Sequence, residues 1–163
     1  MSMSTDPQGR REPRSPFTHI LVPIDGSDTS INAGRLAIQI AASQDIPITF
    51  LYVVDTSAAD KIAEATATAT QTMDQQLKDK GQRYLDYLSR QARDRGLAAD
   101  QVVLHGIPHS EIANFARERD IDLIVIGQVG RQRQLRIGNV AERVIEYAPC
   151  PVLVVKYTPI QQS

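Results

Sequence analysis

The sequence lacks the features that would tie it to an oxidising compartment, a membrane or nucleic acid. Its single cysteine, Cys150, excludes a disulfide within the chain and is expected to be a buried, inert thiol in its apolar setting. No apolar run approaches the roughly 20 residues that span a bilayer, and residues 1–16 hold no hydrophobic stretch of the signal-peptide type. The formal net charge of −1 gives no overall attraction to nucleic acid or anionic lipid. We therefore expect a cytoplasmic protein without nucleic-acid or membrane partners.

Common catalytic and metal-binding motifs are also missing. The chain contains neither GxxxxGK[ST] nor GxGxxG, which argues against a P-loop NTPase and the usual dinucleotide-binding fold. It has no GxSxG motif that would make Ser27 or Ser30 a nucleophile. His19, His105 and His109 belong to different predicted elements, and no cysteine completes a metal pattern around them. We therefore predict no catalytic and no metal-ligating residue.

What the sequence does contain is a regular alternation of short apolar runs and amphipathic segments. The runs predict strands at 19–25, 47–55, 101–106, 121–127 and 151–157. The amphipathic segments predict helices at 30–43 and 65–95, a third from Pro108 and a fourth from Asn139. Such alternation indicates a single α/β domain over 17–157, a doubly wound, Rossmann-like parallel sheet of order 3-2-1-4-5 with helices on both faces. The polar ends, 1–16 and 158–163, are predicted to be tails.

The last predicted helix begins beside a glycine. Asn139 is expected to be its N-cap, with Glu142 as the second member of a capping-box-like pair. The side chains expected to face the core are Val140, Val144, Ile145 and Ala148.

The predicted strand order places two glycine-bearing turns at one crevice. Strands one and four are neighbours where the order reverses, so "DGS" after strand one should lie beside "GQVG" after strand four. Glycine leaves backbone N–H groups open to phosphate, and a helix N-terminus adds more donors. Pro23, Asp25, Val53 and Ile126 would line an apolar slot for a base and ribose. The candidate nucleotide-contacting residues are Pro23, Ile24, Asp25, Val53, Ile126, Gly127, Gly130, Arg133, Gly138, Asn139 and Val140.

Four stretches of the chain resemble the universal stress protein family. They are "HILVPIDGSDTS", "LYVVD", "DLIVIG" and "GNVAERVIEYAPCPVLVVK", and the similarity runs from about 17 to 156. In the family's nucleotide-binding branch, strand four is followed by Gly, two residues, Gly, nine residues, then Gly with Ser or Thr. Gly127, Gly130 and Gly138 match this pattern, but seven residues replace the nine and Asn139 replaces the hydroxyl residue.

The resemblance also implies roles for individual residues. Asp25 resembles the family's acidic residue at the nucleoside end, and Val53 its base-contacting valine. Gly127 and Gly130 resemble the ribose and phosphate glycines. Gly138, Asn139 and Val140 resemble the start of the phosphate-binding helix. The shorter loop is expected to leave less room for a triphosphate.

Simpler structural explanations stand beside these roles. Asp25 and Gly26 can build a turn and satisfy backbone N–H groups before the first helix. Gly127 can serve close packing of a strand against a helix. The loop arginines Arg131, Arg133 and Arg136 either contact phosphate or are solvated.

The sequence thus predicts a stress-response binding or signalling protein that holds an adenine nucleotide (ATP, ADP or AMP, with Mg²⁺ accompanying it) without significant catalysis. In this hypothesis the nucleotide alters the loop 131–137, and a protein partner responds. The alternatives are a dimeric interaction module that binds no nucleotide, and a slow ATPase or nucleotide transferase. The apolar strand 151–157 lies at a sheet edge and should pair with its copy in a homodimer, as the family does. Alternatively, 158–163 covers this edge.

Overall fold

Strands and helices alternate along the part of the chain that the structure describes. The computed structural model describes residues 7–10, 15–57, 67–128 and 139–156. The strands are β1 (Ile20–Pro23), β2 (Ile48–Asp55), β3 (Ala99–Gly106), β4 (Leu123–Gly127) and β5 (Val152–Val155). The helices are α1 (Asp28–Gln44), α3 (Ala67–Asp94), α4 (Pro108–Glu118) and α5 (Asn139–Tyr147). The predicted tails fall mostly outside the described residues.

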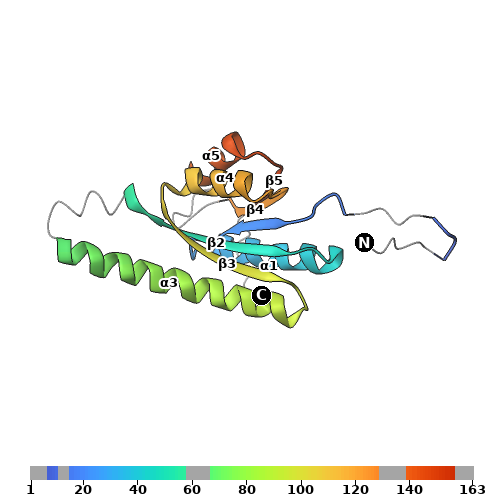
Figure 1. Cartoon of the computed structure of the whole chain (residues 1–163), viewed down its shortest axis with the longest axis horizontal. Coiled ribbons are helices and arrows are strands. Elements are labelled where there is room, and N and C mark those ends of the chain that lie inside the picture. The colour runs from blue at the N-terminus through green and yellow to red at the C-terminus, as the bar shows by residue number, and fades with distance from the viewer. Residues whose placement is uncertain (1–6, 11–14, 58–66, 129–138, 157–163) are drawn as a thin grey trace, which may run out of the picture.

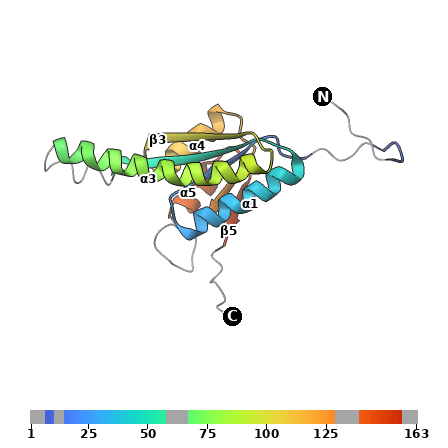
Figure 2. The same cartoon turned by 90° about the horizontal axis from the view of Figure 1, so that it is seen from below.

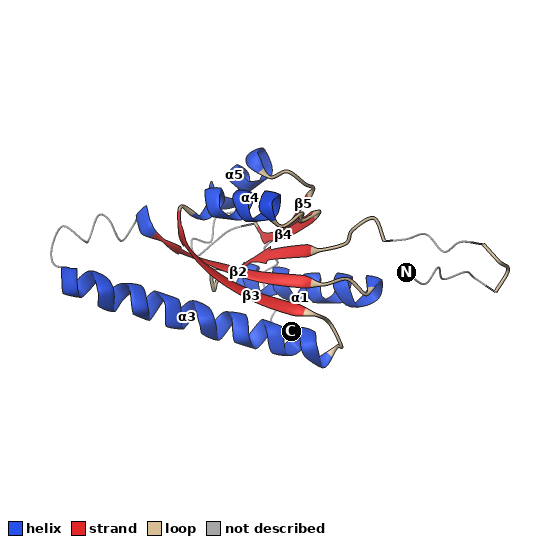
Figure 3. Cartoon of the chain, viewed as in Figure 1, coloured by secondary structure: helices blue, strands red, loops and turns tan. Residues whose placement is uncertain are grey.

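The strands form one parallel sheet of order β3-β2-β1-β4-β5, as predicted. Helices α1 and α3 cover one face, and α4 and α5 cover the other (Figures 1 and 3). The order reverses between β1 and β4, so the carboxyl ends of these two strands meet at one edge of the sheet. In doubly wound sheets this edge is the usual place for a ligand.

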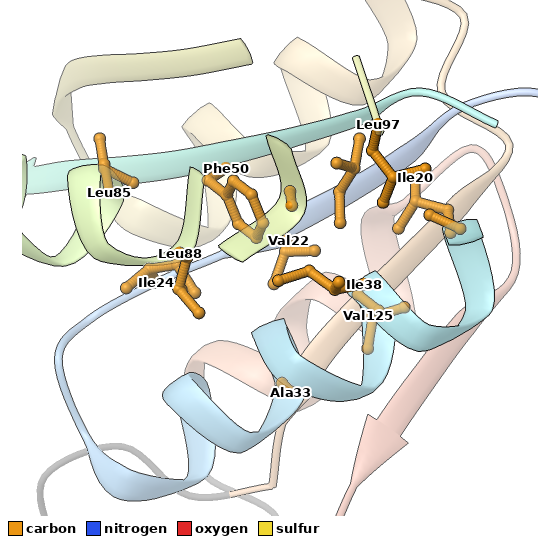
Figure 4. Close-up of a cluster of buried hydrophobic side chains, with 14 of the residues drawn as sticks. Ile20, Val22, Ile24, Ala33, Ile38, Phe50, Leu85, Leu88, Leu97 and Val125 are labelled. Atoms are coloured by element: carbon orange, nitrogen blue, oxygen red, sulfur yellow. The ribbon is translucent and has the colours of Figure 1, made fainter. Parts of the chain in front are cut away.

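Each face of the sheet has its own hydrophobic core, because successive strand residues point to opposite sides. On the α1/α3 side, Ile20 and Val22 of β1 pack with Phe50 of β2 and with Leu85 and Leu88 of α3, all fully buried (Figure 4). On the α4/α5 side, the intervening residues Leu21, Leu51 and Ile124 pack against Ile112 and Val144. β1 is buried along its whole length, which explains why its sequence is a continuous apolar run.

Helix α3 is the longest element, at 28 residues. Seen from below, it crosses α1 and runs past the carboxyl ends of the strands (Figure 2). The predicted helix 65–95 agrees with it within the described residues.

Helix α1 begins two residues earlier than predicted, at Asp28 instead of Ser30. Ser27 is its N-cap, and the Ser27 hydroxyl accepts a hydrogen bond from the backbone N–H of Ser30 at 3.2 Å. The first turn is therefore polar and lies outside the apolar repeat that marks the rest of the helix. Asp45 ends the helix in the left-handed conformation, with φ of 53°.

In helix α5, two of the four side chains predicted to face the core are exposed. Val144 is fully buried and Ala148 partly buried, but Val140 and Ile145 are 40% and 46% exposed, so the prediction that both face the core was wrong. At 100° per residue, Val140 and Ile145 flank the buried stripe of Ala141 and Val144 on opposite sides. Helix α5 already includes Asn139, so this residue is the first of the helix instead of its N-cap.

Candidate functional site

The turns that follow β1 and β4 lie against each other. A Cβ atom placed on Gly127, at the end of β4, would come within 2.9 Å of the Thr29 carbonyl carbon and 3.0 Å of the Ser30 nitrogen. Both atoms belong to the first turn of α1, which follows the β1 turn directly. The predicted adjacency of the two turns is therefore confirmed. Gly127 also serves the simpler role weighed from sequence, because only glycine permits this approach of strand to helix backbone.

The turn after β1 is organised by its own side chains. Asp25 is exposed, and its Oδ1 accepts hydrogen bonds from the backbone N–H of Ser27 at 2.8 Å and from the Ser27 hydroxyl at 2.5 Å. Ser27 in turn caps α1 through Ser30. Among the described residues, no hydrogen bond reaches Asp25 Oδ2. One carboxylate oxygen thus builds the turn, and the other faces no described partner.

Three of the predicted slot residues share one face of the sheet. Val53 and Ile126 pack with the α4/α5 core. Pro23 follows Leu21 of that same core by two residues, so it points to the same side. These three residues lie at the carboxyl ends of neighbouring strands β2, β1 and β4. Pro23 and Ile126 are buried, whereas Val53 is partly exposed, so Val53 offers the accessible apolar surface at this end of the sheet.

Ile24 does not lie on the same face of the sheet as Pro23, Val53 and Ile126. Its side chain is 3% exposed and packs with Val22 in the α1/α3 core, on the opposite face (Figure 4). The alternation of side chains along β1 accounts for this, since Pro23 and Ile24 are successive residues. The side chain of Ile24 is therefore occupied by core packing, and it does not line the slot with Pro23.

The phosphate end of the predicted site is described only at its helix. Asn139 is exposed at the first position of α5, and Val140 follows it. In a doubly wound fold, the N-terminus of such a helix lies at the carboxyl edge of the sheet, where its free N–H groups favour an anion. Gly130, Arg133 and Gly138, together with Arg131 and Arg136, lie outside the described residues.

The histidines and the cysteine lie in separate places. His105 pairs with Asp74 of α3, with 3.1 Å between Nε2 and Oδ1, and the ring of His109 stacks on Tyr147. Burial is the main cause that raises the pKa of the Cys150 thiol, which is partly buried. Within residues 7–10, 15–57, 67–128 and 139–156, no three His, Cys, Asp or Glu side chains gather as a metal site. None of the helices in these ranges could cross a bilayer.

Sequence reasoning missed one neighbour of the site. The aromatic ring of Tyr84, on α3, lies against Gly26 in the turn after β1. The sequence predicts Tyr84 only as a residue within the helix 65–95. No pattern along the chain identifies this contact, because 58 residues separate the two partners.

Most of the chain is similar to one known protein family. Residues 16–156 match the universal stress protein family. The chain belongs to this family. Among its relatives, universal stress protein MJ0531 of Methanocaldococcus jannaschii is 37% identical over 142 residues, covering 86% of this chain and 82% of the relative.

Solved structures of the universal stress protein family have the same fold. The structure of MJ0577, from the same archaeon, is similar with a TM-score of 0.76 and 25% identity, over 87% of this chain and 97% of that one. The Archaeoglobus fulgidus universal stress protein in complex with dAMP has a TM-score of 0.63 at 24% identity, with 86% and 98% of the two chains covered. An Arabidopsis thaliana family member with AMP bound has a TM-score of 0.65 at 18% identity, with 90% and 95% covered. At these identities the last two establish the shared fold.

Proposed function

We propose that this protein binds an adenine nucleotide at the carboxyl edge of its sheet, between the turns after β1 and β4, and does so without significant catalysis. The observation that carries the proposal is the contact of Gly127 with the first turn of α1, which joins the two turns into one site. The adenine nucleotides held by the archaeal and plant family members support the ligand class.

In this proposal each part of the nucleotide has a matching surface. The base would lie on Val53, Pro23 and Ile126, which share one face. The ribose hydroxyls would donate to Asp25 Oδ2, the oxygen that the turn leaves without a described partner. The phosphates would meet the N–H groups at the start of α5.

The glycine motif completes the proposed phosphate site. Gly130 and Gly138 would present backbone N–H groups, with Arg133 contributing charge and Mg²⁺ accompanying a triphosphate. The loop between these glycines is two residues shorter than in the family motif. A series of AMP, ADP and ATP affinities would therefore measure how many phosphates the site accepts.

Turnover is not expected. Hydrolysis requires a positioned water, a base and usually a metal. Asp25 is the acidic side chain that we assign to the nucleoside, and one of its oxygens is already engaged by Ser27. We infer a sensing or signalling role in the cytoplasm, in which the bound nucleotide changes what a protein partner contacts.

The test is thermal unfolding of the purified protein with AMP, ADP or ATP. Ligand at 100 times its dissociation constant should stabilise the fold by about 2.7 kcal/mol and raise the melting temperature. Gly138→Val and Val53→Asp should abolish the shift while the apo proteins remain folded. Gly9→Val is the control: a Cβ at Gly9 meets no atom within 4 Å, and the backbone strain that its φ of +75° imposes falls in the N-terminal segment, outside the proposed site.

Each alternative has its own result. No shift with any of the three nucleotides, and none released from denatured, filtered protein, would leave the interaction module as the function. Accumulation of ADP over hours would make the protein a slow ATPase. Loss of the shift in Gly9→Val as well would remove the assignment of the site.

We further propose a homodimer through the β5 edge. The two edge strands differ in their side chains: on β3, Gln101 accepts a hydrogen bond from Gln82 of α3, and His105 pairs with Asp74. At the β5 edge, Leu153 is 38% exposed and Ile145 of α5 is 46% exposed. An apolar edge strand flanked by exposed aliphatic side chains suits pairing with a second copy of this chain.

A further inference from the structure

Gly26 is a glycine for two separate reasons. Its φ of +85° is one that residues with a side chain rarely adopt. The space that a Cβ would need is also filled, because it would lie 2.3 Å from Cε2 and 2.6 Å from Cζ of Tyr84. The ring of Tyr84 therefore rests directly on the backbone of the turn.

The turn under Tyr84 is the same one that organises the candidate site. It carries Asp25, whose carboxylate holds Ser27, and Ser27 caps the first turn of α1. That first turn is also the backbone against which Gly127 packs. A shift of the turn would therefore move the acidic side chain, the helix start and the β4 contact together.

Helix α3 packs closely against other elements both before and after Tyr84, and these contacts fix the position of Tyr84. A Cβ on Gly81 would lie 2.2 Å from Cδ1 of Tyr52, and a Cβ on Gly34 would lie 2.8 Å from Cδ1 of Leu88. Residues 81, 84 and 88 follow one another at helical spacing, so they share one face of α3. Helix α3 thus docks against β2, the β1 turn and α1 through one row of contacts that glycine makes possible.

We propose that Tyr84 is a positioning residue for the nucleotide site: its ring holds the turn of Asp25, Gly26 and Ser27 in the conformation that accepts the nucleoside. This inference rests on the proposed nucleotide binding. Coupling between two sites is reciprocal. Nucleotide at the turn therefore also stabilises the docking of α3 around Tyr84, and α3 becomes a second element through which occupancy is transmitted.

The first measurement uses the full chain without nucleotide. In Tyr84→Leu, hydrogen exchange at the Ser27 and Asp28 amides should be about tenfold faster, the size expected when an aromatic contact is lost. Exchange in β1 and in the buried part of β4 before Gly127 should stay unchanged. Tyr84→Phe keeps the ring and should behave as wild type. Tyr87→Leu is the control on the same helix, since Tyr87 is 44% exposed and contacts Arg35 instead of the turn.

The second measurement is affinity for AMP and ATP. Tyr84→Leu should weaken binding about tenfold, whereas Tyr84→Phe and Tyr87→Leu keep the wild-type affinity. Nucleotide should also slow exchange of the α3 amides around 81–88 in wild type. If wild type binds neither nucleotide, the proposed function fails, and the exchange experiment still tests the contact. If wild type binds and Tyr84→Leu binds equally well, the positioning role is refuted, whatever the exchange rates are.

A double-mutant cycle tests the contact between Gly26 and Tyr84 independently of nucleotide binding. Gly26→Ala adds a Cβ that meets the Tyr84 ring, and it also imposes backbone strain. In a Tyr84→Ala background, the backbone strain caused by Gly26→Ala remains, but its Cβ no longer collides with a ring. Gly26→Ala should therefore lower the melting temperature by less in that background than in wild type. Equal losses in both backgrounds would contradict the contact as the basis of the proposal.

Discussion

Asp122 joins the start of β1 to the start of β4. Its Oδ2 accepts hydrogen bonds from the backbone N–H of Thr18 at 2.7 Å and the Thr18 hydroxyl at 2.8 Å, and its Oδ1 accepts one from the His19 N–H at 3.0 Å. Desolvation alone would raise the pKa of Asp122, but the hydrogen bonds from His19 and Thr18 together lower it. β4 begins at Leu123 instead of at the predicted 121, because the backbone N–H of Ile121 still bonds the Ala116 carbonyl at the end of α4.

Replacing Asp122 should weaken the fold. Asp122→Ala removes three hydrogen bonds, two from backbone N–H groups and one from a hydroxyl, so we expect a loss of about 1–2 kcal/mol in the free energy of unfolding. Denaturant titration measures it. Asp79→Ala is the matched control, because the Asp79 carboxylate accepts from Gln75 alone among the described residues, on an exposed helix face, and should matter by less than about 0.5 kcal/mol. Equal effects of the two substitutions would contradict the role given to Asp122.

His19 should make stability depend on pH in the acid range. Burial lowers its pKa, although Asp100 and Asp122 act in the opposite direction. The folded state therefore resists protonation more than the unfolded state, whose histidine pKa is about 6.5. Stability is present above that pH and declines as pH falls below it. His19→Gln should flatten the dependence of the unfolding free energy on pH between about 5 and 7. An unchanged slope would exclude His19 as the cause.

Replacing Ser89, unlike replacing Asp122, should increase the stability of the protein. It is fully buried in α3, and its hydroxyl has no hydrogen-bond partner among the described residues. Ser89→Ala removes this unsatisfied group and raises helix propensity, so we expect a gain of about 0.5–1 kcal/mol by thermal or chemical unfolding. A loss of stability would indicate that the hydroxyl has a partner in the folded protein.

At the scale of the element, α3 depends on the absence of a side chain at Gly81. Within a helix, Gly→Ala normally gains about 1 kcal/mol. Here the new Cβ would meet the ring of Tyr52, which is 5% exposed and has little room to move. We expect Gly81→Ala to destabilise the protein by about 1–3 kcal/mol despite the better propensity. The same substitution with Tyr52→Leu should cost less, and a stabilising Gly81→Ala would contradict this packing.

The glycines also mark the limit of prediction from sequence. Gly81 and Gly34 interrupt helical segments, where a glycine signals only weaker helix propensity. Their partners Tyr52 and Leu88 lie far away in the chain, so no local pattern joins them. The turn after β1 was identified from "DGS", but the ring of Tyr84 above it was not. Contacts between distant elements of this kind depend on the exact approach of helices to the sheet.

At the scale of the whole molecule, the strand order could be predicted because it depends on few features. Continuous apolar runs such as 20–23 and 123–127 are typical of strands in a parallel sheet covered on both faces. Alternation with helices then restricts the topology to a doubly wound order. The faces of α5 were predicted less well, because Val140 and Ile145 are apolar without being buried in the single chain. Apolar periodicity does not distinguish a side chain that packs on its own sheet from one that another molecule could cover.

The proposed dimer can be tested by placing a charge on an exposed apolar side chain of β5. A lysine in place of Leu153 would put a charge into the apolar contact between two β5 strands, so Leu153→Lys should weaken association at least about 100-fold. Sedimentation velocity over a range of concentrations measures the change. Tyr87→Lys introduces the same charge at a site of similar exposure on α3, 44% against 38%, and should leave the dimer intact. A wild type that stays monomeric, or a Leu153→Lys variant that stays dimeric, would exclude β5 as the interface.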